Sequence, residues 1–171
     1  MRAEIQPDRA HAIFTRNQLA VFRYLKRLTR RADEAEDLTQ QVFVRALRSL
    51  GSYEHRERER AWLFTIARNV FLNSRRDRAR NPGASQPVLE PRSQPVQLVR
   101  AGLEQAIDRL AELDRDCFLL RELAGLGYED IARVLEMTPA AVRSRIHRAR
   151  LELRAALSGE DTRLAKEVRK S

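Results

Sequence analysis

The segment 128–153, YEDIARVLEMTPAAVRSRIHRARLEL, contains two short amphipathic patterns separated by a turn. The first pattern predicts a helix over 128–135, because its apolar residues recur at helical spacing. Thr138 is a favoured N-cap and Pro139 suits a first helical position, so a second helix is expected to begin there. That helix carries one apolar stripe, formed by Val142, Ile146, Ala149 and Leu153. The segment therefore predicts two helices packed about a tight turn.

The second helix of this pair also carries a basic surface away from its apolar stripe. Its other sides hold Arg143, Ser144, His147, Arg148, Arg150 and Arg154. An arginine-rich helix is often no more than a solvated face. Here, however, the basic side chains are confined to the side away from the apolar stripe, on a helix that follows a capped turn. This arrangement is typical of a DNA-binding helix-turn-helix, whose second helix lies in the major groove.

The composition agrees with a polyanionic partner. The chain has 171 residues and a net charge of +9, which favours nucleic acid first and an anionic membrane surface second. Hydrophobic residues make up 43% and aromatic residues 6%, a balance that suits small helical bundles. The sequence shows neither the apolar run of about 18 residues that a membrane span needs nor a signal peptide. A soluble, cytoplasmic protein without membrane insertion is expected.

A proline-rich segment divides the chain. Segment 81–97, NPGASQPVLEPRSQPVQ, contains four prolines, which predicts an extended linker. The expected fold is all-α, with two small helical domains over 8–80 and 98–158. A polar tail is expected over 159–171.

Helices are expected within both domains. The predicted ranges are 8–31, 33–50, 60–80, 99–110 and 115–124, followed by the helix-turn-helix. Asp33 is predicted to cap the second helix, with Glu36 completing a capping box, and Asp114 is predicted to cap the fifth. Leu47 and Leu103 are assigned to buried faces.

Neither metal nor covalent chemistry is indicated. Cys117, the one cysteine, lies in the apolar run CFLL and is expected to be a buried core thiol. His11, His55 and His147 are scattered, and the sequence has no glycine-rich phosphate loop. The sequence therefore predicts no catalytic residue, no metal and no cofactor.

The predicted third helix carries a mixed row of an aromatic ring, two amides and a guanidinium. The row consists of Trp62, Asn69, Asn73 and Arg76. Such side chains can stack on unpaired bases and hydrogen-bond to them. The plainer alternative is a core tryptophan beside solvated amides.

Three motifs resemble parts of the bacterial sigma factors of the sigma-70 family. Residues 35–46, AEDLTQQVFVRA, resemble the region 2 helix, and residues 61–69, AWLFTIARN, resemble the helix after it. Residues 123–132, LAGLGYEDIA, together with 142–150, VRSRIHRAR, resemble region 4. Two such domains joined by a short linker resemble the extracytoplasmic-function (ECF) group of that family.

The resemblance implies a transcription initiation factor that binds core RNA polymerase and directs it to promoter DNA. The positions that match polymerase contacts are Asp37, Gln40 and Gln41, facing the clamp coiled coil of the largest subunit. Region 4 is expected near the flap region of polymerase. Gln41 replaces the usual glutamate of this motif, which lowers the charge offered to polymerase. Members of this group are commonly held inactive by an anti-sigma factor, so one is expected here.

The resemblance also implies promoter-reading residues in both domains. For the −10 element, loop 52–60 and the helix after it match the part that captures a flipped base, through Tyr53, Trp62, Asn69, Asn73 and Arg76. For the −35 element, the base-facing positions match Arg143, Ser144 and His147, while Arg145, Arg148 and Arg150 suit phosphate contacts. Two residues at helix ends depart from the usual pattern of this family: Gly127 stands where serine is common, and Glu136 stands where glycine is common. If the backbone at Glu136 has a positive φ, that residue costs roughly 1 kcal/mol.

Two other functional classes compete with the sigma factor. A helix-turn-helix repressor or activator with an unrelated first domain would explain region 128–153. It would leave the polar row at Asp37–Gln41 and the row beginning at Trp62 unexplained. A DNA-acting enzyme would need a carboxylate pair or a histidine–cysteine cluster, and the sequence shows neither.

Overall fold

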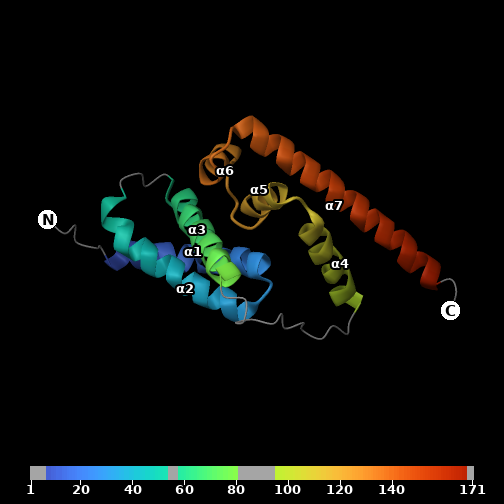
Figure 1. Cartoon of the computed structure of the whole chain (residues 1–171), viewed down its shortest axis with the longest axis horizontal. Coiled ribbons are helices and arrows are strands. Elements are labelled where there is room, and N and C mark those ends of the chain that lie inside the picture. Colours follow the sequence, from blue (N-terminus) through green and yellow to red (C-terminus); the bar gives the residue numbers. More distant parts are fainter. Residues whose placement is uncertain (1–6, 54–57, 81–94, 169–171) are drawn as a thin grey trace.

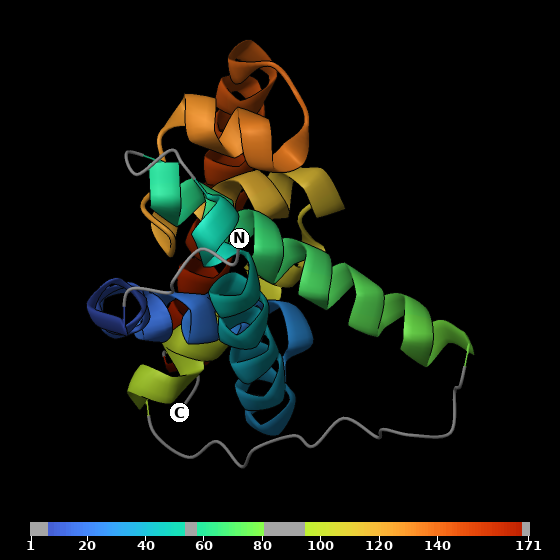
Figure 2. The same ribbon diagram turned by 90° about the vertical axis from the view of Figure 1, so that its left-hand side faces the viewer.

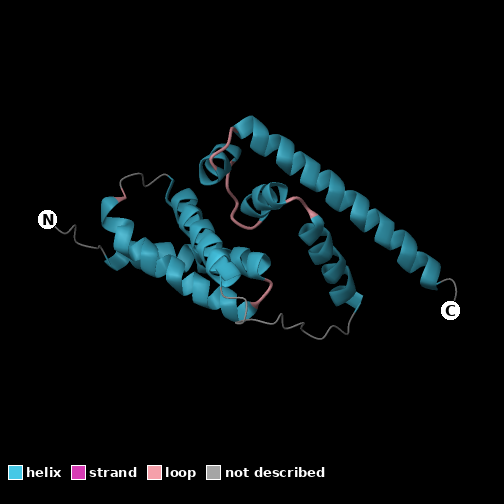
Figure 3. Cartoon of the chain, viewed as in Figure 1, coloured by secondary structure: helices cyan, strands magenta, loops and turns pink. Residues whose placement is uncertain are grey.

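The computed structural model describes residues 7–53, 58–80 and 95–168 of the chain, and every regular element in these ranges is a helix (Figures 1 and 3). The first group comprises α1 (Pro7–Thr29), α2 (Ala32–Ser49), a short 3-10 helix (Leu50–Ser52) and α3 (Glu59–Arg80). The second group comprises α4 (Pro95–Arg109), α5 (Glu112–Glu122), α6 (Tyr128–Leu135) and α7 (Pro139–Val168). The predicted all-α fold is confirmed.

The first group is a three-helix bundle in which α1, α2 and α3 all contact one another. Its core holds fully buried apolar residues from all three helices: Val21, Leu25, Val42, Leu63 and Phe64. The Tyr24 ring meets the Phe64 ring edge-on, with centroids 5.5 Å apart. This packing fixes the rotation of α3, because its buried side is held against α1 and α2.

The second group is built on the long helix α7, against which α4, α5 and α6 pack. The predicted apolar stripe of α7 is buried throughout: Val142, Ile146, Ala149 and Leu153. Ile131 of α6 is also fully buried. Cys117 of α5 is buried as expected, and burial raises the pKa of its thiol to about 11. The thiol therefore stays protonated at neutral pH and packs as a core side chain.

The two predicted carboxylate caps are wrong. Helix α2 begins before Asp33, with Arg31 as an extended N-cap residue that makes no side-chain capping bond. Asp33 instead accepts a hydrogen bond from Arg31 Nε at 3.1 Å. Helix α5 begins at Glu112, so Asp114 lies inside its first turn and points into the protein. In both helices the carboxylate pairs with arginine instead of capping the helix.

Other boundaries and faces also differ from the predictions. Leu47 and Leu103 are 40% and 38% exposed, so the predicted burial of both side chains is wrong, and Leu47 instead lines an apolar hollow between α1 and α2. Helix α4 starts at Pro95, inside the predicted linker, since proline is well suited to the first turn of a helix. Helix α7 continues to Val168, so the predicted polar tail is helical over most of its length. The rest of the predicted linker, 81–94, lies outside the described residues.

The two groups of helices pack against each other. Helix α3 contacts α6, and Figures 1 and 2 show α6 beside the start of α3. Buried apolar residues of both groups belong to one continuous cluster. No helix in the described part of the chain is long and apolar enough to cross a membrane.

Candidate nucleic-acid and polymerase interfaces

The turn between α6 and α7 has the geometry that the sequence predicts. Glu136 ends α6 in the left-handed region, with φ 54° and ψ 47°, and the Met137 N–H donates to the Ala132 carbonyl at 2.9 Å. The Thr138 hydroxyl then accepts a hydrogen bond from the Ala141 N–H at 3.2 Å, so the predicted N-cap of α7 is confirmed. The departure at Glu136 thus carries the strain expected of a non-glycine residue at positive φ.

This turn presents the first half of α7 to solvent. Arg143, Ser144 and His147 are exposed, while Val142 and Ile146 on the opposite stripe are buried. The side chains expected to face bases therefore share an open surface. Their rotation is fixed by the buried stripe.

The three arginines expected to contact phosphates are already engaged in ion pairs with α5. Asp114, 2% exposed, accepts from Arg145 Nη1 and from Arg148 Nε, each at 2.7 Å. Arg150 Nη2 lies 2.8 Å from Glu122 Oε1, in a pair that is exposed on both sides. A buried carboxylate between two arginines orders their side chains and offsets part of their charge. The structure thus gives Arg145 and Arg148 a structural partner that the sequence did not indicate.

Arg143 has a different environment. Its guanidinium lies over the ring of Tyr128, with Cζ 5.4 Å from the ring centroid. Arg121 of α5 approaches the same ring at 5.1 Å. These distances are within the range of cation–π attraction.

The row on α3 is open to solvent along most of its length. Asn69, Asn73 and Arg76 are exposed, and Arg76 Nη1 donates to Asn73 Oδ1 at 3.4 Å. Trp62 is half-buried, and its ring stacks on that of Tyr53, with centroids 4.5 Å apart and planes 18° apart. The structure thus places these five predicted residues on or beside one side of α3. Residues 54–57 of the expected loop lie outside the described residues.

The polar row on α2 is exposed as well. Asp37, Gln40 and Gln41 all face solvent. Val44, 45% exposed, extends this row by one turn. The exposed side of α2 is therefore a mixed polar and apolar strip suited to a protein partner.

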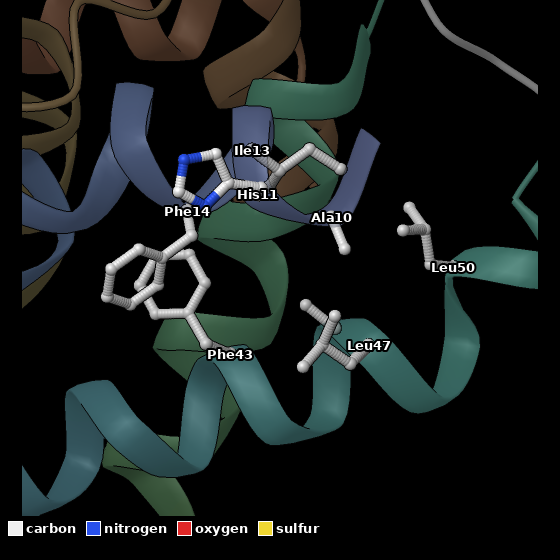
Figure 4. Close-up of a pocket in the computed structure, with 8 residues that line it drawn as sticks. Ala10, His11, Ile13, Phe14, Phe43, Leu47 and Leu50 are labelled. Atoms are coloured by element: carbon white, nitrogen blue, oxygen red, sulfur yellow. The ribbon is translucent and has the colours of Figure 1, made fainter. Parts of the chain in front are cut away.

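An apolar hollow of about 230 Å³ lies between the start of α1 and the end of α2 (Figure 4). The Phe14 and Phe43 rings meet edge-on at one end of it, 4.8 Å apart, and Leu47 and Leu50 lie at the other. His11 is its one titratable lining residue. Among the described residues, no group of three or more His, Cys, Asp or Glu side chains comes together as a metal site.

Two family models match this chain. The model described as Sigma-70 region 2 matches residues 13–81, and the model described as Sigma-70, region 4 matches residues 100–153. Together they cover more than half of the chain. The chain belongs to the sigma-70 family.

Relatives and solved structures place this sigma factor in the ECF group. It is 35% identical to the RNA polymerase sigma factor YlaC of Bacillus subtilis over 144 residues, 78% of this chain and 83% of the relative. It is 35% identical to the ECF RNA polymerase sigma factor EcfG of Rhodopseudomonas palustris over 137 residues, 76% and 75% of the two chains. The solved sigma factor RpoE of Bartonella quintana, in complex with the anti-sigma factor NepR, superposes with a TM-score of 0.71. That match has 28% identity and covers 85% of this chain and 94% of the other.

As a member of this family, the protein is an initiation factor that binds core RNA polymerase and confers promoter specificity. The first helical group belongs to region 2 and the second to region 4. The recognised family therefore agrees with the predicted function.

Polar contacts join region 2 to region 4, and the sequence did not indicate them. Arginines of region 2 supply the donors in each of these pairs, whereas carboxylates or carbonyls of region 4 supply the acceptors. The contacts are Arg27 with the Glu104 carbonyl and with Asp108, Arg30 with Asp108, Arg60 with the Ala124 carbonyl, Arg68 with Asp116, and Arg75 with Glu112. Residues so far apart in sequence can be paired only once the fold of both regions is known.

Polar groups at the centre of this junction are buried, and their desolvation costs free energy. Burial raises the pKa of Asp116, and the neighbouring Arg68 lowers it by less. The Tyr24 hydroxyl and Arg115 Nε are buried without a hydrogen-bond partner among the described residues. The junction therefore combines the continuous apolar cluster with polar groups that are buried at a cost in desolvation.

Proposed function

We infer that region 2 of this sigma factor holds polymerase through α2 and reads the −10 element through α3, while region 4 reads the −35 element through the start of α7. The observation that carries this division is the row of Asn69, Asn73 and Arg76 on α3. These side chains are exposed on a helix whose other sides are committed to the core of region 2 and to contacts with region 4. Exposed amides on a helix that is otherwise packed suit recognition of bases.

The chemistry of this row fits a base that has left the duplex. A flipped base needs an aromatic face to stack on and a polar group for its exposed edge. The stacked rings of Tyr53 and Trp62 offer the first, and the Asn69 amide, which both donates and accepts, offers the second. Arg76 lies on the same row and suits the adjacent phosphate.

The polymerase surface is assigned to the exposed strip of α2. Asp37 supplies a charge, Gln40 and Gln41 supply amides, and Val44 supplies apolar area. Interfaces commonly combine such a mixture. This assignment places the protein in the cytoplasm, where polymerase acts, and leaves catalysis to polymerase itself.

An anti-sigma factor is the expected regulator. The solved sigma factor of Bartonella quintana is in complex with the anti-sigma factor NepR. By similarity to that relative, we expect a partner that covers the polymerase-binding and promoter-reading surfaces of this chain.

The test is transcription in vitro with purified protein, bacterial core polymerase and a pooled promoter library. Sequencing of the start sites should yield promoters that share two spaced upstream elements. Co-elution with core polymerase should accompany this result. Binding to duplex DNA alone, without co-elution or transcripts, would support a repressor instead.

A further inference from the structure

Arg143 is held differently from the three arginines that follow it on the recognition helix, Arg145, Arg148 and Arg150. Arg145, Arg148 and Arg150 each pair with a carboxylate of α5. Arg143 has no carboxylate partner within the described part of the chain, and its guanidinium lies over the Tyr128 ring. Its charge is therefore not offset by a carboxylate, and the N–H groups at the edge of its planar guanidinium are available for hydrogen bonds.

The Tyr128 ring is itself fixed to the body of region 4. Tyr128 is the first residue of α6 and is half-buried. Arg121 lies 5.1 Å from the ring centroid, and its Nη1 donates to the Leu126 carbonyl at 2.8 Å. A chain of contacts thus runs from the Leu126 carbonyl through Arg121 and Tyr128 to Arg143, joining α5, α6 and α7.

This stack brings two guanidinium groups to one aromatic ring. The ring attracts each cation, but the two cations repel each other. Neither Arg121 nor Arg143 forms an ion pair among the described residues. The stack therefore favours an additional electronegative group, such as the O6 and N7 edge of guanine, which matches the fork of an arginine.

Stacking also reduces the entropy that reading a base would cost. An unrestrained arginine samples many rotamers and loses that freedom when it makes two hydrogen bonds to one base. A stacked Arg143 has given up part of this freedom before DNA arrives. Preorganisation of this kind raises affinity and fixes which base edge is within reach.

We propose that Tyr128 is a positioning residue of region 4, which holds the Arg143 guanidinium in the orientation from which it reads a guanine of the −35 element. The proposal rests on the function proposed above, in which Arg143 faces the bases. It assigns to Tyr128 a part in promoter specificity without contact to DNA.

The experiment uses the full chain with core polymerase and a promoter library in which only the −35 element is randomised. Transcripts are sequenced for the wild type and for the variants Arg143→Ala, Tyr128→Leu, Tyr128→Phe and the double variant Arg143→Ala with Tyr128→Leu. The readout is the preference for guanine over other bases at each −35 position. Thermal unfolding of each variant is measured in parallel.

Arg143→Ala should lose the guanine preference at one position, by about 5- to 150-fold for a bidentate contact. Tyr128→Leu should lose several-fold of the preference at that same position, while Tyr128→Phe, which keeps the ring, should retain it. The double variant should match Arg143→Ala, because Tyr128 acts through Arg143. A folding defect alone would lower transcription from every promoter alike and leave the preference unchanged.

Three results would overturn the proposal: an unchanged guanine preference in Tyr128→Leu, a loss in Tyr128→Phe equal to that in Tyr128→Leu, or a further loss in the double variant. If Arg143→Ala itself kept the preference, the base-reading role of Arg143 would be wrong and the role of Tyr128 would fall with it. Should Tyr128→Leu not fold, Tyr128→Met supplies a second side chain without an aromatic face.

Discussion

Arg68 Nε lies 3.3 Å from Asp116 Oδ2, across the junction between region 2 and region 4. Asp116 is 5% exposed, and burial raises its pKa more than Arg68 lowers it. The ionised carboxylate is therefore less favourable in the folded protein than in the unfolded chain. Ion pairing here holds two domains together at a cost in desolvation.

The first prediction concerns the pH dependence of stability. The pKa of Asp116 is higher in the folded protein than in the unfolded chain. Its contribution to the free energy of unfolding is therefore greatest below the unfolded pKa and is lost as pH rises through the folded pKa. The amide introduced by Asp116→Asn does not titrate, so the free energy of unfolding of the wild type relative to this variant should fall as pH rises above about 4, the ordinary pKa of an aspartate. Urea unfolding at several pH values measures this difference, at about 1.4 kcal/mol for each unit of pKa shift. A difference that grows with pH would contradict the assigned direction.

The second prediction concerns the carboxylate that holds two arginines. Asp114→Ala leaves Arg145 and Arg148 without their shared partner, so region 4 should lose about 2 kcal/mol of stability. This is less than the ~3–5 kcal/mol for a fully buried pair, because both arginines are partly exposed. Glu122→Ala is the matched control on the same helix, since its exposed pair with Arg150 should contribute less than about 1 kcal/mol. Equal losses in chemical denaturation would show that burial of Asp114 is unimportant.

The third prediction uses two residues with positive φ. Glu136, at φ 54°, should gain about 1 kcal/mol of stability on substitution by glycine. Gly125, at φ 64°, should lose a similar amount on substitution by alanine, although an added Cβ would meet no atom within 4 Å. Thermal unfolding should therefore shift in opposite directions for the two variants. A shift in the same direction would mean that backbone strain does not dominate at these turns.

The fourth prediction separates the two surfaces of region 2. Asp37→Ala should weaken binding to core polymerase by about tenfold, the loss expected for a hydrogen bond to a charged group. Glu36→Ala, an exposed acid one residue away on the same helix, is the control and should bind normally. Asn69→Ala should bind polymerase normally but lower promoter opening or alter the choice of −10 sequence. Unchanged transcription with both Asp37→Ala and Asn69→Ala would disprove these assignments.

Local signals in the sequence were enough to place the helix-turn-helix. The Thr138 cap and the buried stripe from Val142 to Leu153 depend on neighbours within a few residues, and the structure confirms both. The predicted cap at Asp114 failed for the opposite reason, because its arginine partners come from α7 and are brought close only by packing. The predicted cap at Asp33 failed for a local reason: α2 begins one residue earlier, and Asp33 pairs with Arg31.

The environment of the predicted −35 residues also depended on tertiary packing. Spacing along α7 gave no means of telling Arg143, which stacks on Tyr128, from Arg145 and Arg148, which pair with Asp114. That distinction arises only when α5 and α6 are packed against α7. A helical wheel therefore finds the basic helix but does not show which of its arginines remain available.

Under the assignment proposed above, in which α3 reads the −10 element and α7 the −35 element, the contact between α3 and α6 limits the length of promoter that both helices can reach together. Because α6 also contacts α7, the axes of α3 and α7 are separated near these contacts by at most two interhelical spacings, or about 20 Å. The −10 and −35 elements differ by about 25 base pairs, or about 85 Å of B-form duplex. The fifteen peptide steps from Arg80 to Pro95 can span up to about 50 Å, so the covalent connection permits the domains to part. In the arrangement of this structure the two reading helices are too close together to span a promoter. Region 2 and region 4 must therefore separate at their arginine–carboxylate contacts before both elements can be bound together.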